Sequence, residues 1–156
     1  MKGKYVNCLL ASLLVMMMLL MGSCGVKRSP EARKHYIICT TNLKLLTMGM
    51  LIWAEEHEGE LPEAQGWEEK VNQSIEEDKY FSCPSCKKHY IYLGNGQNKQ
   101  SYYRNSDIII VFMCEGNHLG KTNVAFLDGH VDLLDTEEVN EAVEAAKANG
   151  GLPRLK

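Results

Sequence analysis

The amino-acid sequence predicts an α+β domain in which a long N-terminal helix packs on a small antiparallel sheet of about four strands, with a C-terminal helix. Three observations support this fold class. An apolar stripe at helical spacing runs through residues 30–58, aromatic and β-branched segments separated by turn residues fill 90–134, and a capped amphipathic segment covers 136–149. The chain has 156 residues, 45% of them hydrophobic and 24% charged, which suits one domain with a core.

The N-terminal sequence predicts an export signal. Lys2 and Lys4 precede an apolar run over residues 9–21 that is too short to span a membrane and suits a signal peptide. The run ends in Gly22-Ser23-Cys24, which resembles a bacterial lipobox. We therefore expect Cys24 to carry acyl chains that anchor the protein to a membrane outside the cytoplasm. An ordinary secretory signal followed by an incidental cysteine is the alternative.

The expected division of the chain follows from this signal. It comprises a lipoprotein-type signal peptide, a tether, one domain and a short tail, at residues 1–23, 24–29, 30–151 and 152–156.

The helix over residues 30–58 has clear ends and one continuous apolar face. Ser29-Pro30 is a typical helix start, and Glu58-Gly59 is a typical stop. Between them, apolar residues recur three and four apart, which predicts a helix face packed on the sheet. We expect Leu46 and Met50, in the middle of this stripe, to be buried there; a coiled-coil partner is the alternative.

The remaining elements follow in order. Trp67, Val71 and Ile75 predict a short helix over 67–75. In the sheet, Asp128-Gly129 predicts a two-residue type I′ turn that pairs Phe126 with Val131. Asp135, with Glu138 three residues later, predicts a capping box at the start of the final helix.

Composition and missing motifs narrow the function. The formal net charge is −3, so there is no basic surplus for binding nucleic acid. The sequence contains no Walker loop, GxGxxG, GxSxG or HExxH motif. We therefore expect a protein that is not an enzyme and that uses no cofactor.

The cysteines outside the signal offer three interpretations. Because the domain is expected outside the cytoplasm, structural disulfides are favoured, and the preferred pairs are Cys39–Cys83 and Cys86–Cys114. The second interpretation is a Zn²⁺ site built from Cys83, Cys86 and His89 with Cys114 or His118. The third is a thiol–disulfide redox pair at Cys83 and Cys86, although such a pair normally opens a helix and a strand follows here.

Three ordered segments resemble the prepilin-type processing-associated proteins, which are named for a His followed by nine residues and Asp-Gly. The matching segments are His118 to Asp128-Gly129, the stretch from Cys39 to Pro62, and Phe81-Ser-Cys-Pro-Ser leading to Tyr92. The resemblance implies a type II secretion or type IV pilin-like (pseudopilin-like) fold and an interaction with pilin-like or secretion-system proteins.

The chain departs from that family at its start, because it has a lipobox-like segment in place of a prepilin cleavage site. The resulting interpretation is a membrane-anchored, pseudopilin-like lipoprotein of the bacterial envelope with a structural or interaction role. Within the signature, we expect His118 and Asp128 to be a structural hydrogen-bonded pair beside Gly129. If they do not pair, Asp128 is a turn former and His118 is a candidate ligand.

Overall fold

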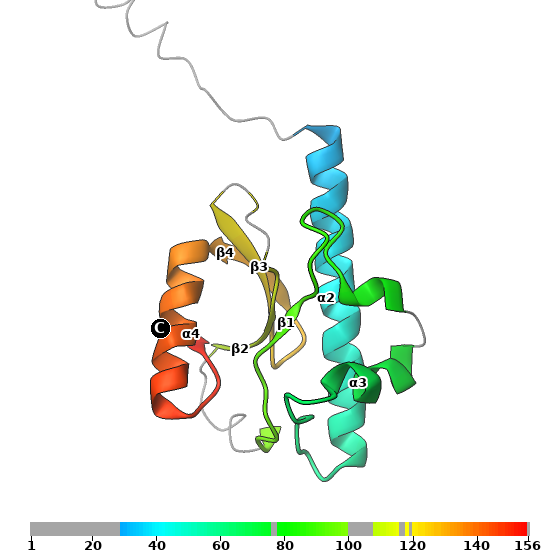
Figure 1. The fold of residues 1–156 in the computed structure, drawn as a ribbon, viewed down its shortest axis with the longest axis vertical. Helices are drawn as coiled ribbons and strands as arrows, with labels where there is room; N and C mark the ends of the chain where they lie inside the picture. Colours follow the sequence, from blue (N-terminus) through cyan, green and yellow to red (C-terminus); the bar gives the residue numbers. More distant parts are fainter. Residues whose placement is uncertain (1–28, 76–77, 100–107, 116–117, 119, 156) are drawn as a thin grey trace, which may run out of the picture.

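The structure is a computed structural model that describes residues 29–75, 78–99, 108–115, 118 and 120–155. The expected signal, Cys24 and the tether before Ser29 lie outside the described residues. The fold is α+β, as predicted, with a long helix packed on an antiparallel sheet and a C-terminal helix (Figure 1). Its elements are α2 (Pro30–Glu56), α3 (Trp67–Ile75), η1 (Asp78–Phe81), β1 (Ile91–Tyr92), β2 (Ile108–Met113), β3 (Lys121–Phe126), β4 (Val131–Asp135), α4 (Thr136–Asn149) and β5 (Arg154–Leu155).

Helix α2 begins and ends near the predicted residues. The Ser29 side chain accepts a hydrogen bond from the Ala32 amide at 3.2 Å, which satisfies one of the free amides of the first turn. The helix ends at Glu56, and Gly59 follows in the left-handed region at φ 86°. Leu46 and Met50 are fully buried, which confirms the expectation for the middle of the stripe.

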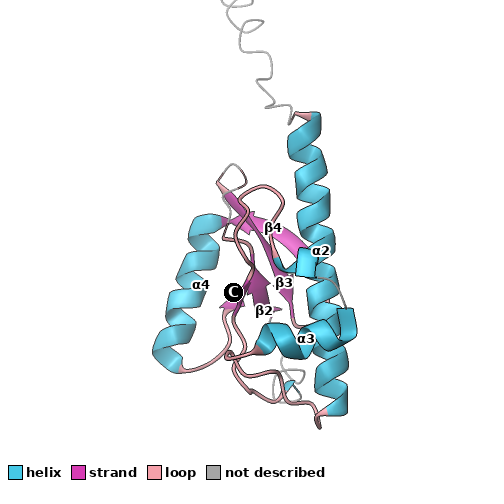
Figure 2. Cartoon of the chain, turned by 45° about the vertical axis from the view of Figure 1, so that its right-hand side comes forward, coloured by secondary structure: helices cyan, strands magenta, loops and turns pink. Residues whose placement is uncertain are grey.

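The sheet has the strand order β1-β2-β3-β4 with antiparallel pairing, and β5 pairs with the start of β2. Strand β5 lies in the segment expected to be a tail. The helices α2 and α4 cover opposite faces of the sheet, so two apolar cores form (Figure 2). The larger core lies under α2 and α3, and the smaller core lies under α4 around Ile110, Val124 and Val139.

The β3–β4 hairpin forms, but its predicted register is wrong by one residue. Ala125, not Phe126, is the partner of Val131. The Phe126 amide donates to the His130 carbonyl, so the loop has three residues and only Gly129, at φ 92°, takes a positive φ. This arrangement is a turn closed by a glycine bulge, which an Asp-Gly sequence suits as well as the type I′ turn.

The register places alternate residues of β3 in different cores. Val124 and Phe126 belong to the core under α4, whereas Ala125 belongs to the core under α2. At the end of the hairpin, Asp135 makes no side-chain cap to α4. Its carboxylate instead forms an ion pair with Lys121 at 3.1 Å, so the expected capping box is absent.

Candidate metal centre

Three thiols and one imidazole converge in the larger core, which contains all three cysteines. The donor atoms of Cys39, Cys83, Cys114 and His118 all lie within 4.8 Å of one another. The three cysteines are buried and His118 is half-buried. We call this group the Cys₃His cluster. It joins residues that are up to 79 positions apart in the sequence.

Three different segments supply the four side chains. Cys39 lies on the inner face of α2, and Cys83 opens the turn that follows η1. Cys114 comes immediately after β2, and His118 lies in the connection from β2 to β3. The buried stripe of α2 therefore brings Cys39 to the sheet, where the strand end carries Cys114.

Local hydrogen bonds hold both loops in place. The Cys83 amide donates to the Lys88 carbonyl at 2.9 Å, and the Lys87 amide donates back to the Cys83 carbonyl at 2.9 Å. On the other side, the His118 amide donates to the Lys121 carbonyl at 2.8 Å. Each ligand-bearing loop is thus closed by its own backbone bonds.

The spacing of the donor atoms fits a tetrahedral ion. With Zn–S bonds of about 2.3 Å and Zn–N bonds of about 2.0–2.1 Å, tetrahedral angles place sulfur about 3.6 Å from nitrogen. His118 Nε2 lies 3.4 Å from Cys114 Sγ and 3.9 Å from Cys39 Sγ, on either side of that value. Small shifts of these side chains would place all four donors around one Zn²⁺ ion.

Outer hydrogen bonds supply partial positive charge to the sulfurs. Asn123 Nδ2 on β3 donates to Cys39 Sγ at 3.2 Å, from a fully buried side chain. The Cys86 amide forms a hydrogen bond with the Cys83 side chain. Amide donors of this kind orient metal-binding thiolates and disperse their negative charge.

The close packing of these groups also shifts their proton affinities. Hydrogen bonds from the Cys114 and Cys39 side chains hold the pKa of the Cys83 thiol well below its usual range. Hydrogen bonds with the Cys39 and Cys83 side chains raise the pKa of His118 to about 9. Burial raises the pKa of the Cys86 thiol, so the two cysteines of the Cys-Pro-Ser-Cys turn differ in chemistry.

The cluster differs from both of the site arrangements expected from the sequence. None of the four described cysteines forms a disulfide, so neither the Cys39–Cys83 nor the Cys86–Cys114 bond is present. The physical reason is that three sulfurs meet at one point instead of forming two separate pairs. Cys39 does lie beside Cys83, as the expected pairing required.

The structure also differs from the zinc interpretation, because among Cys83, Cys86 and His89 only Cys83 lies in the cluster. Cys86 is half-buried beside the Cys₃His cluster but is not part of it. His89 lies on the surface, where its Nδ1 is 2.9 Å from a Glu68 carboxylate oxygen. Cys39 takes their place in the group of candidate ligands, and its position on the inner stripe of α2 was the signal in the sequence.

The expected pair of His118 and Asp128 is absent. His118 points at the thiols, whereas the Asp128 carboxylate accepts hydrogen bonds from the His130 amide at 3.1 Å and the His130 ring at 2.5 Å. Asp128 therefore shapes the turn in which Gly129 takes its positive φ. His118 is the candidate ligand that the alternative named.

No family model, curated protein sequence or solved structure matches this chain.

Proposed function

We propose that this chain is a zinc-stabilised structural module of the bacterial envelope, in which Cys39, Cys83, Cys114 and His118 bind one Zn²⁺ ion. The observation that supports the metal is the convergence of these four donor atoms within 4.8 Å of one another. Three thiols and one imidazole form a ligand set that structural zinc sites use. Soft thiolate ligands in a tetrahedral arrangement favour zinc over hard cations such as Mg²⁺ or Ca²⁺.

The ligand set favours a structural role over a catalytic one. Catalytic zinc sites keep one coordination position open for water or substrate, whereas four protein ligands close the site. Cys39, Cys83 and Cys114 are each at most 1% exposed, so substrate has little access to the sulfurs. The proposal therefore gives the protein no enzymatic activity.

A bound ion would join three parts of the fold. It links α2, the turn after η1 and the β2–β3 connection, which otherwise meet through side-chain packing and a few hydrogen bonds. One of those bonds runs from Asn42 Nδ2 on α2 to the Ser82 carbonyl at 3.2 Å. Metal binding would also keep the three thiolates from pairing with one another in an oxidising compartment.

The cellular location and role rest on the sequence. The lipobox-like segment at Cys24 supports a lipid anchor on a membrane, and the segments resembling the prepilin-type proteins support a pseudopilin-like module. The helical spine on an antiparallel sheet agrees with such a module. We therefore propose an envelope lipoprotein that acts by supporting or binding other envelope proteins, among them pilin-like or secretion-system components.

The metal is tested on protein purified under reducing conditions without added zinc. Metal analysis is expected to give one zinc per chain, and removal of the metal is expected to leave four reactive thiols in the mature domain, from Cys39, Cys83, Cys86 and Cys114. The opposite result is a metal-free protein whose mass shows two disulfides in material isolated from the envelope. That result would replace the zinc site with disulfides.

A further inference from the structure

The outer face of α2, which points away from the sheet, is apolar and is largely exposed among the described residues. Among the described residues, this face holds four of the large hydrophobic side chains that are exposed. They are Ile37 at 53%, Ile38 at 37%, Met48 at 55% and Ile52 at 46%. With Thr41 and the half-buried Leu45, they follow helical spacing along one side of α2. Between Ile37 and Ile52, this stripe is about 22 Å long at 1.5 Å per residue.

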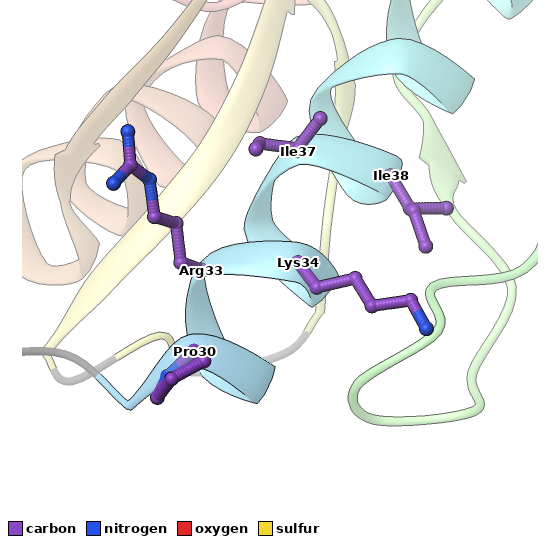
Figure 3. A pocket seen from close by; sticks show the side chains of 5 residues that line it. All are labelled: Pro30, Arg33, Lys34, Ile37 and Ile38. Carbon is purple, nitrogen blue, oxygen red and sulfur yellow. The ribbon is translucent and has the colours of Figure 1, made fainter.

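The Lys and Arg residues of α2 lie alongside this stripe, whereas the acids of the helix, Glu31, Glu55 and Glu56, lie beyond its two ends. No Asp or Glu occurs between Ala32 and Ala54, although the whole chain carries a net charge of −3. Arg33, Lys34 and Lys44 are exposed on or beside the stripe. Figure 3 shows the first turns of α2, where Arg33 and Lys34 flank Ile37 and Ile38 in a surface groove. An apolar stripe with flanking cations suits an interface that offers both hydrocarbon and anionic groups.

Helix α2 is long and apolar enough to cross a membrane, by length and composition only, and 44% of its most apolar stretch is buried. Its inner face forms the larger core through Leu43, Leu46 and Met50, so those side chains are not free to face lipid. The exposed half of the helix is therefore suited to lie on a membrane surface instead of crossing it.

We propose that the outer face of α2 rests in the headgroup region of a membrane that contains anionic phospholipids. This inference rests on the lipid anchor in the proposed function, because the anchor limits the distance between the start of α2 and the bilayer. Four residues lie between Cys24 and Ser29, and the five Cα–Cα steps allow at most about 17 Å between the acylated residue and the start of α2. The N-terminal end of the stripe then lies within reach of the bilayer that holds the acyl chains, and the sheet faces away from the lipid.

Charge argues against a second copy of this chain as the occupant. Because both copies would be anchored next to the start of α2, their helices would pair in parallel. Two such faces in contact would then bring Arg33, Lys34 and Lys44 of both copies together, away from Glu55 and Glu56 at the other end of the helix. Like charges at an interface oppose association, whereas anionic lipid attracts each Lys or Arg near its surface.

The test uses residues 24–156 with Cys24→Ser, so that no acyl chain contributes to binding. This segment contains both cores, whose buried residues all lie between Cys39 and Leu152. Co-sedimentation with phosphatidylcholine vesicles, with and without phosphatidylglycerol, measures the partition coefficient. We expect binding to the anionic vesicles that weakens as salt is added. Lys34→Gln with Lys44→Gln should lower the partition coefficient about 25-fold, at about five-fold per cation.

Matched controls separate the face from general surface effects. Met48→Ser with Ile52→Ser should weaken vesicle binding, whereas Ile91→Ser, which changes an exposed side chain on β1, should not. Lys147→Gln on α4 is the control for charge. Equal loss in a face variant and its control would overturn the proposal, as would the absence of any binding to anionic vesicles. A dimer in sedimentation that Met48→Ser dissociates would assign the face to a second copy instead.

Separate measurements distinguish a failure of this proposal from a failure of the proposed function. Acyl labelling of Cys24 in cells tests the anchor. Metal analysis of the protein used for vesicle binding tests the zinc site. Vesicle binding that fails while Cys24 is labelled would remove only the docking face.

Discussion

Cys114→Ser removes one of the three sulfurs of the Cys₃His cluster while changing little else in the fold. The side chain is 1% exposed, and its Sγ lies 3.4 Å from His118 Nε2. Serine keeps nearly the same volume but is a poor zinc ligand. The variant should therefore be less stable than the wild type mainly in the presence of zinc. The quantity to measure is the gain in stability that zinc gives to each protein.

The expected size follows from linkage. At free zinc 1,000 times the dissociation constant, binding stabilises the folded state by about 4.1 kcal/mol. If the loss of one ligand weakens zinc binding about 100-fold, the same zinc concentration stabilises the folded variant by only about 1.4 kcal/mol. The variant then gains about 2.7 kcal/mol less from zinc than the wild type does. For a domain of this size, each 1 kcal/mol shifts Tm by about 4 °C, so Tm in zinc should fall by about 10 °C.

The assay is thermal unfolding by circular dichroism in zinc buffered with a competing chelator and, separately, in excess chelator under reducing conditions. Cys86→Ser is the matched control, because Cys86 lies in the same turn as Cys83 but outside the cluster. The control should retain the full zinc-dependent rise in Tm. A rise in Tm of equal size for Cys114→Ser and the wild type would refute the ligand assignment, and loss of the rise in Cys86→Ser would put Cys86 among the ligands.

The other predictions concern the core, the turn and the anchor. Leu46→Ala should lower the free energy of unfolding by about 2–5 kcal/mol in urea titration, because Leu46 is fully buried; a loss below about 0.5 kcal/mol would mean that the stripe is not packed on the sheet. Gly129→Ala should cost about 1–2 kcal/mol, because φ is 92°, whereas Gly151→Ala, which meets no atom within 4 Å, should cost less in the same titration. Cys24→Ser should abolish acyl labelling and sharply reduce membrane fractionation of the full chain, and unchanged labelling would reject the lipid anchor.

The helices were predictable because their ends and buried faces are determined by residues that lie close together in the sequence. The ranges 67–75 and 136–149 agree with α3 and α4, and Ser29 caps α2 as expected. Each of these features depends on residues within one or two turns of one another. The hairpin was predictable in kind but not in register, because Asp128-Gly129 suits a two-residue loop and a three-residue loop, and packing of β3 between two helices decides between them.

The site was only partly predictable, because its members come from three distant segments. The Cys-Pro-Ser-Cys spacing marked Cys83, and the inner stripe of α2 placed Cys39 beside it. Nothing local shows that the end of β2 meets the same point. His89 is nearer than His118 to Cys83 in the sequence, yet the segment before β1, in which His89 pairs with Ser82, places His89 on the surface beside Glu68.

The spacing of the His–Asp-Gly signature has a different meaning from the one expected. Strand β3 lies between His118 and Asp128, and its six residues cover about 20 Å at 3.4 Å per residue. His118 is hydrogen-bonded through its amide to Lys121, at the first residue of the strand, whereas Asp128 lies in the turn just beyond its end. The two side chains are therefore held at opposite ends of one strand. The nine intervening residues set the length of β3, so one end of the hairpin delivers an imidazole to the thiols while the other end makes the turn into β4.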